Sequence, residues 1–75
     1  MNDLQYVKNA ENTLLSSFYT DSTLLEDSNF KESFFYFSDN REIFNAMKIL
    51  VKKGLPIDED FIQKEIKNIN NFNER

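Results

Sequence analysis

Apolar side chains recur along most of the chain every three or four residues, which is the spacing of one helical face. This pattern predicts helices over about 3–18, 39–53 and 59–69, and a shorter helix at 23–27 after the polar break 20–22. The apolar positions are Leu4, Val7, Leu14, Leu15, Phe18, Leu24, Leu25, Ile43, Phe44, Met47, Leu50, Val51, Phe61, Ile62, Ile66 and Ile69. We therefore predict an all-α fold of about four helices.

The helix over 39–53 has recognisable signals at both ends. Ser38 or Asp39 is a suitable N-cap, and Glu42 lies three residues after Asp39, where the carboxylate of a capping box would be. At the other end, Gly54 suits the left-handed residue that follows a helix. These signals predict a sharply bounded helix.

The last helix is expected to begin after a short extended link. Pro56 holds Leu55 out of helical geometry, and Asp58 is a suitable N-cap. The Asn-rich segment 70–75 is expected to fray. The chain shows no internal repeat, so residues 1–75 are interpreted as a single helical interaction domain.

Four aromatic residues follow one another at 34–37. No regular element buries four consecutive side chains on one side, so at least one or two of these rings are expected outside the core. One interpretation packs Phe35, and also Phe34, in the core. The other assigns surplus rings to an exposed apolar patch of the kind that marks protein interfaces. The candidate interface residues are Phe34, Tyr36 and Phe37.

The composition restricts how so short a chain is stabilised. It contains no Cys and no His, which excludes disulfides and zinc sites of the usual kind. Small domains commonly need a disulfide, a metal or a partner for stability, so association with a partner is the remaining source of stabilisation. The net charge of −4 and the scattered basic residues argue against direct nucleic-acid binding. We see neither a signal peptide nor a membrane span, and we expect a cytoplasmic protein.

Catalytic motifs are missing from the sequence. One glycine cannot supply a phosphate-binding or dinucleotide-binding loop, and the lack of His and Cys excludes the common nucleophile systems. The acidic run 58–60 is interpreted as helix capping rather than a cation site, and Glu26-Asp27 as a solvated surface rather than an acid/base pair. We therefore expect no catalytic residues, no metal and no cofactor.

Three motifs together resemble the N-terminal domain of DnaB-type replicative DNA helicases. Segment 35–47, FYFSDNREIFNAM, is similar to the family pattern F-Y-x-x-x-H-x-x-I-F-x-A-M, and 54–58, GLPID, looks like its G-x-P-I-D element. Upstream, 11–15 resembles the start of the E-x-x-L-L-G motif. The three pieces stand in family order and cover roughly 8–66. The fold implied is the small orthogonal helical bundle that forms the head of this domain.

The sequence departs from the family pattern in three ways. Asn40 stands where the family commonly has His, and Ser16 where it commonly has Gly. The family domain also continues into a helical hairpin and an ATPase motor, which are not in this sequence. The residues that the resemblance marks as mainly fold-defining are Glu11, Leu14, Leu15, Phe35, Ile43, Phe44, Met47, Gly54, Pro56, Ile57 and Asp58.

The resemblance implies a non-catalytic interaction module that helps build the helicase collar by self-association and docks primase or a helicase loader. Two alternatives stay open. The chain can also be the helicase-binding domain of primase, although its motifs begin soon after Met1, as in the helicase. It can also be a stand-alone adaptor or inhibitor that mimics the helicase head, which predicts a stop codon soon after Arg75.

Overall fold

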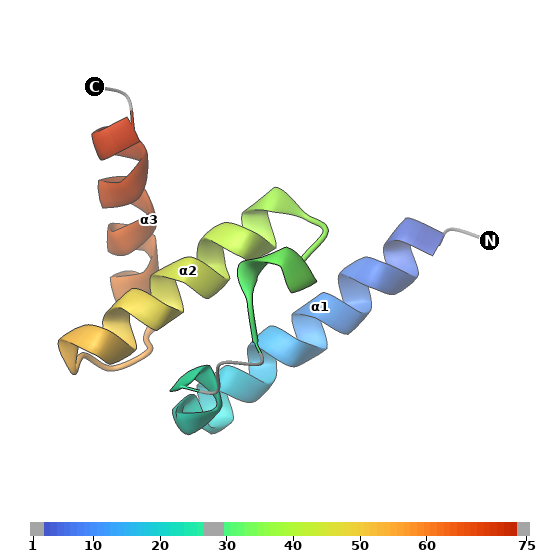
Figure 1. Cartoon of the computed structure of the whole chain (residues 1–75), viewed down its shortest axis with the longest axis horizontal. Helices are drawn as coiled ribbons and strands as arrows, with labels where there is room; N and C mark the ends of the chain where they lie inside the picture. Colours follow the sequence, from blue (N-terminus) through green and yellow to red (C-terminus); the bar gives the residue numbers. More distant parts are fainter. Residues whose placement is uncertain (1–2, 27–29, 74–75) are drawn as a thin grey trace.

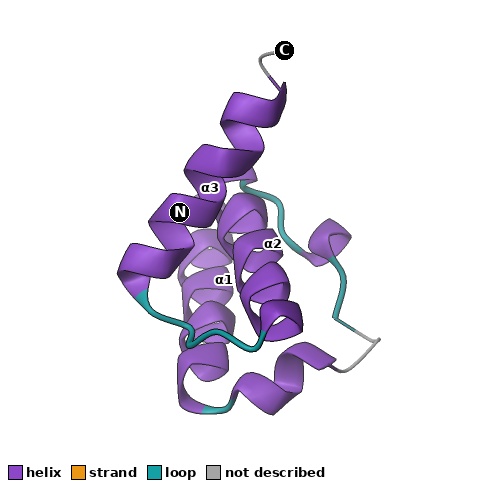
Figure 2. Ribbon diagram, turned by 90° about the vertical axis from the view of Figure 1, so that its left-hand side faces the viewer, coloured by secondary structure: helices purple, strands orange, loops and turns teal. Residues whose placement is uncertain are grey.

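Three α-helices and two short 3₁₀ helices make up the part of the chain that the computed structural model describes, residues 3–26 and 30–73. In chain order they are α1 (Asp3–Thr20), η1 (Ser22–Glu26), η2 (Glu32–Phe34), α2 (Ser38–Lys53) and α3 (Glu59–Asn73). Helices α1 and α2 lie side by side, and α3 crosses the C-terminal end of α2 steeply (Figure 1). In the described residues, loops occupy only the short links between helices (Figure 2).

The all-α prediction is confirmed, with three α-helices where about four helices were expected. The difference lies in the short element predicted at 23–27, which is the 3₁₀ helix η1 and not an α-helix. Asp21 explains this tighter turn. Its backbone oxygen accepts a hydrogen bond from the amide of Leu24 at 3.2 Å, and its Oδ1 accepts one from the amide of Thr23 at 3.1 Å. Asp27 lies outside the described residues.

The hydrophobic core is built around α2. Phe44 has no exposed surface and packs between the rings of Phe18 on α1, at 5.8 Å between centroids, and Phe35, at 5.1 Å. Helices α1, η1, η2 and α3 all contact α2. The buried apolar residues are Leu15, Phe18, Leu25, Phe35, Phe44, Ala46, Met47, Leu50 and Ile62. The predicted inner face of the second helix therefore forms the centre of the fold.

The N-terminus of α2 differs from the prediction. The N-cap is Phe37, which makes no side-chain cap hydrogen bond, so neither Ser38 nor Asp39 caps the helix. Asp39 is the second helical residue, and its carboxylate pairs with Lys8 of α1 at 2.7 Å. The predicted capping box with Glu42 is wrong, because the helix begins one residue before Asp39, whose Oδ1 accepts a hydrogen bond from the amide of Asn40 at 2.9 Å.

The C-terminus of α2 follows the prediction. Gly54 has φ 72°, in the left-handed region. Its amide donates to the backbone oxygen of Val51 at 3.1 Å, and the amide of Leu55 donates to that of Leu50 at 2.9 Å. These two bonds form a Schellman motif, which satisfies carbonyls that the end of the helix leaves without partners.

Helix α3 begins as predicted and ends later. The Oδ1 of Asp58 accepts a hydrogen bond from the amide of Asp60 at 2.8 Å, so the N-cap prediction is confirmed. The helix continues to Asn73, past the predicted end at 69. The predicted end at 69 is therefore wrong, because Asn lowers helix propensity by only a few tenths of a kcal/mol, whereas the strong helix breakers Gly and Pro both lie upstream. The expected fraying of the segment stays a prediction.

Candidate protein interface

In the aromatic segment 34–37, some rings lie in the core and others lie on the surface. Phe35 is 2% exposed and belongs to the core, whereas Phe34 and Tyr36 are 56% and 64% exposed. Phe37 is half-buried against the ring of Tyr36, at 5.1 Å between centroids. The prediction that one or two rings lie outside the core is confirmed, and the interpretation that places Phe34 in the core is wrong. The role of these rings in an interface stays a prediction.

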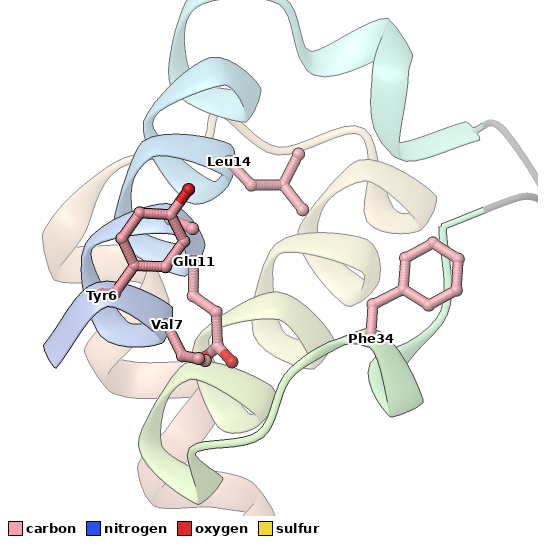
Figure 3. Close-up of a pocket in the computed structure, with 6 residues that line it drawn as sticks. Tyr6, Val7, Glu11, Leu14 and Phe34 are labelled. Carbon is pink, nitrogen blue, oxygen red and sulfur yellow. The ribbon is translucent and has the colours of Figure 1, made fainter. Parts of the chain in front are cut away.

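Phe34 faces α1 across an open groove of about 400 Å³ (Figure 3). The groove is lined by Tyr6, Val7, Ala10, Glu11, Leu14 and Phe34. Sequence reasoning missed Tyr6, which is 76% exposed. The available signal was its spacing from Ala10 and Leu14, at four and eight residues, which places all three on one face of α1. The groove is thus apolar on both walls.

Glu11, at the base of this groove, is a buried carboxylate with donors at both oxygens. Its Oε2 accepts a hydrogen bond from the backbone amide of Tyr36 at 2.6 Å, and its Oε1 accepts one from Nδ2 of Asn40 at 2.8 Å. Burial acts to raise the pKa of Glu11, but these hydrogen bonds outweigh it and hold the pKa below its ordinary value of 4.5. The carboxylate is therefore ionised and serves as an anchor between α1 and α2.

Lys8 places a positive charge beside this anchor. Its Nζ lies 2.7 Å from Oδ2 of Asp39, 3.4 Å from Oδ1 of Asn40 and 4.9 Å from the centre of the Phe37 ring. The hydrogen bond from Lys8 lowers the pKa of Asp39 below its ordinary value. One lysine on α1 thus contacts the aromatic segment and the first turn of α2 together.

Within the described residues, the structure shows no arrangement that would support metal chemistry. No group of three or more His, Cys, Asp or Glu side chains is placed to hold a metal ion. The acidic run 58–60 and Glu26 are exposed. None of the described helices has the combined length and apolar character needed to cross a membrane. The geometry around Glu11 is that of a structural anchor, since both of its oxygens are occupied by donors from the chain itself.

A comparison with protein-family models matches residues 3–75 to the DnaB-like helicase N terminal domain. The chain belongs to this family. Neither the comparison with curated proteins nor that with solved structures gave a match. The resemblance seen in the sequence is therefore confirmed, and the match covers every residue that the structure describes, including both walls of the groove.

In this DnaB-like domain, the motif residues occupy three kinds of position. Leu15, Phe35, Phe44 and Met47 are buried in the core, and Leu14, Ile43 and Ile57 pack against it. Gly54 follows the last residue of α2, Asp58 caps the start of α3, and Pro56 is exposed in the link between these helices. Asn40, where the resemblance led us to expect His, is buried and donates its hydrogen bond to Glu11. Asn40 thus supplies a donor to the carboxylate.

Proposed function

We propose that this domain is a non-catalytic protein-interaction module of a replicative DNA helicase. In this role it associates with copies of itself in the helicase collar and docks primase or a helicase loader. Membership of the DnaB-like family supports the setting in DNA replication. The observation that carries the interaction role is the pair of exposed rings, Tyr6 and Phe34, that line an open apolar groove, together with the exposed Tyr36 two residues further along the chain.

The exposed rings are numerous enough to contribute a useful affinity. Burying a Phe side chain completely contributes roughly 1.5–3 kcal/mol. Phe34 and Tyr36 each keep more than half of their surface exposed in the isolated chain, so a partner that covers both supplies a few kcal/mol before the costs of association. Aromatic residues are also enriched at the centres of protein interfaces. The surface therefore fits a protein partner of modest affinity.

The charge of the chain favours a protein over a nucleic acid as partner. The net charge is −4, and sequence-independent binding to DNA depends on Lys and Arg that displace counterions from phosphates. Lys8, whose Nζ lies 4.9 Å from the centre of the Phe37 ring, is already paired with Asp39. We therefore propose that any contact of the assembly with DNA is made outside this domain.

The primase partner is tested by titrating the isotope-labelled chain with the C-terminal helical domain of the cognate primase. We expect amide shifts to change around 6–14 and 34–37. The double variant Phe34→Ser/Tyr36→Ser should weaken binding at least about tenfold while leaving the fold unchanged, because both side chains are exposed. The matched control is Leu55→Ser, at an exposed apolar residue in the α2–α3 link. No shift at high micromolar primase domain would contradict the docking role.

Self-association is tested separately by sedimentation velocity over a wide range of chain concentrations. We expect the average mass to rise with concentration for the wild type and to rise less for the Phe34→Ser/Tyr36→Ser variant. Association of folded chains also stabilises them, so the melting temperature should increase with concentration. A monomer whose melting temperature is independent of concentration would contradict self-association by this domain alone.

A further inference from the structure

Glu11 belongs to two features of the surface at once. Its side chain lines the groove together with Tyr6 and Leu14, and its carboxylate binds the segment that carries Phe34 on the opposite side (Figure 3). Only 6% of the residue is exposed, so it contacts the chain itself far more than solvent. The groove and the aromatic segment therefore share one anchoring residue.

The backbone that Glu11 binds lies between two helices. The amide of Phe35 donates to Glu32 within η2, at 3.0 Å, and the amide of Arg41 donates to Phe37 in the first turn of α2, also at 3.0 Å. Between these bonds, the amide of Tyr36 donates to Glu11 at 2.6 Å. Removing the acceptor of a buried backbone amide costs about as much free energy as a lost hydrogen bond.

Asn40 extends the same anchor into α2. Its side chain is 2% exposed, and its Nδ2 donates to Oε1 of Glu11 at 2.8 Å. The two carboxylate oxygens therefore reach both ends of the turn that leads from the aromatic segment into α2. Because the acceptor is charged, each bond is stronger than one between neutral groups.

We propose that Glu11 is the positioning residue of the aromatic interface. It fixes the backbone at Tyr36 and the first turn of α2, and so sets the distance of Phe34 from α1 and the outward direction of the Tyr36 ring. This inference rests on the proposed function, because it assigns to Glu11 the presentation of a surface that binds a partner. A merely structural residue would affect stability without a specific effect on that surface.

The test compares the wild type with Glu11→Gln at a temperature where both are folded. Glutamine keeps the shape but is neutral and has one oxygen and one NH₂ group, so it keeps both partners only if the Asn40 amide turns its Oδ1 away from Lys8, whose Nζ lies 3.4 Å from that oxygen. We expect hydrogen exchange of the Tyr36 amide to accelerate about tenfold, as loss of a charged hydrogen bond predicts. We also expect the affinity for the primase C-terminal domain to fall by a similar factor.

Two further variants separate positioning from stability. Glu65→Gln is the matched control, because Glu65 is also a buried glutamate and accepts a hydrogen bond from Lys53 at 2.6 Å, between α2 and α3. It should leave both Tyr36 exchange and primase affinity unchanged. The double variant Glu11→Gln/Asn40→Asp should restore both, because the introduced glutamine then accepts from the Tyr36 amide and donates to the carboxylate introduced on α2.

Each outcome decides the proposal. Tyr36 exchange that is no faster than in the wild type overturns it, and so does faster exchange with unchanged affinity. If Glu11→Gln does not fold, Asn40→Ala, which removes one of the donors and leaves the carboxylate charged, is measured in the same two ways. If the wild type binds neither the primase domain nor another copy, the proposed function fails and the positioning role fails with it. In that case faster Tyr36 exchange still identifies Glu11 as the anchor of the segment.

Discussion

Phe44 is the residue on which the core depends most. It has no exposed surface and contacts rings from both neighbouring elements. We predict that Phe44→Ala lowers the free energy of unfolding by about 3–5 kcal/mol. Domains of this length have a total stability of only roughly 4–11 kcal/mol, so this loss removes a large part or all of it. Urea denaturation followed by circular dichroism measures the change. Phe34→Ala, at a 56% exposed ring, serves as the control, and unchanged stability of the Phe44 variant would contradict the core described above.

The stability of the domain should depend on pH through its two anchored carboxylates. The pKa values of Glu11 and Asp39 both lie below their ordinary values of 4.5 and 3.8. For an acid with a lowered folded-state pKa, the stabilisation is fully present above the ordinary value and is lost as pH falls through the folded-state pKa. We predict that stability is constant down to about pH 5 and then decreases.

Urea denaturation at a series of pH values measures this dependence. In Glu11→Gln the decrease below pH 5 should become smaller, because glutamine does not titrate, and the part that remains belongs to Asp39 and the other carboxylates. A variant curve parallel to that of the wild type would show that Glu11 has the same pKa in the folded and unfolded chains.

The junction between α2 and α3 depends on the backbone of Gly54. This residue has φ 72°, and a Cβ added there would meet no heavy atom within 4 Å. The penalty for Gly54→Ala is therefore conformational and not steric, and we predict a loss of about 1–2 kcal/mol. Gly54→Asn should lose less, because Asn tolerates left-handed geometry better. Chemical denaturation of the three proteins checks the order Gly, Asn, Ala. Equal stability of the Ala variant would contradict a left-handed conformation at this position.

The elements that local sequence specifies were predicted well. The apolar spacing from Ile43 to Val51 predicted α2, and Gly54 and Asp58 predicted the junction with α3. These features depend on residues within a few positions of one another. The N-cap of α2 was predicted wrongly, since the helix begins at Ser38, and Asp39 in its first turn pairs with Lys8, a residue 31 positions away.

The candidate interface was predictable only in part, for the same reason. Four consecutive rings cannot all be buried, so the sequence could show that some of 34–37 lie outside the core. It could not show which ones do, nor that Phe34 faces Tyr6 across a groove. The anchor at Glu11 joins residues 25 and 29 positions apart in the chain, and no local pattern reports such a pairing.

The molecule is more extended than an ordinary globular domain of the same length. Its radius of gyration is 12.7 Å, whereas a chain of this length packed as an ordinary globular domain has roughly 11 Å. The N-terminal end of α1 and most of α3 project from the centre (Figure 1). Tyr6 on the first projection is 76% exposed. A molecule of this shape offers a large surface for association and keeps a small core of its own.

This arrangement predicts an unequal distribution of stability among the helices. Helix α2 contacts all the other elements, whereas α3 contacts α2 alone in the described part of the chain. Ile62 is the one described apolar residue of α3 in the buried core, and Ile66 and Ile69 are half-buried. Local opening is easiest where few apolar contacts must be broken.

We therefore predict that native-state hydrogen exchange is slowest in the amides of α2 and fastest, among the α-helices, in the second half of α3. The measurement is exchange followed by NMR at a temperature well below unfolding. Ile62→Ala should accelerate exchange throughout α3 and leave α2 protected, because it removes the main contact of α3 with the core. Equal protection of α2 and α3 would show instead that the chain opens as a single cooperative unit, and that α3 is held as firmly as the helix on which it packs.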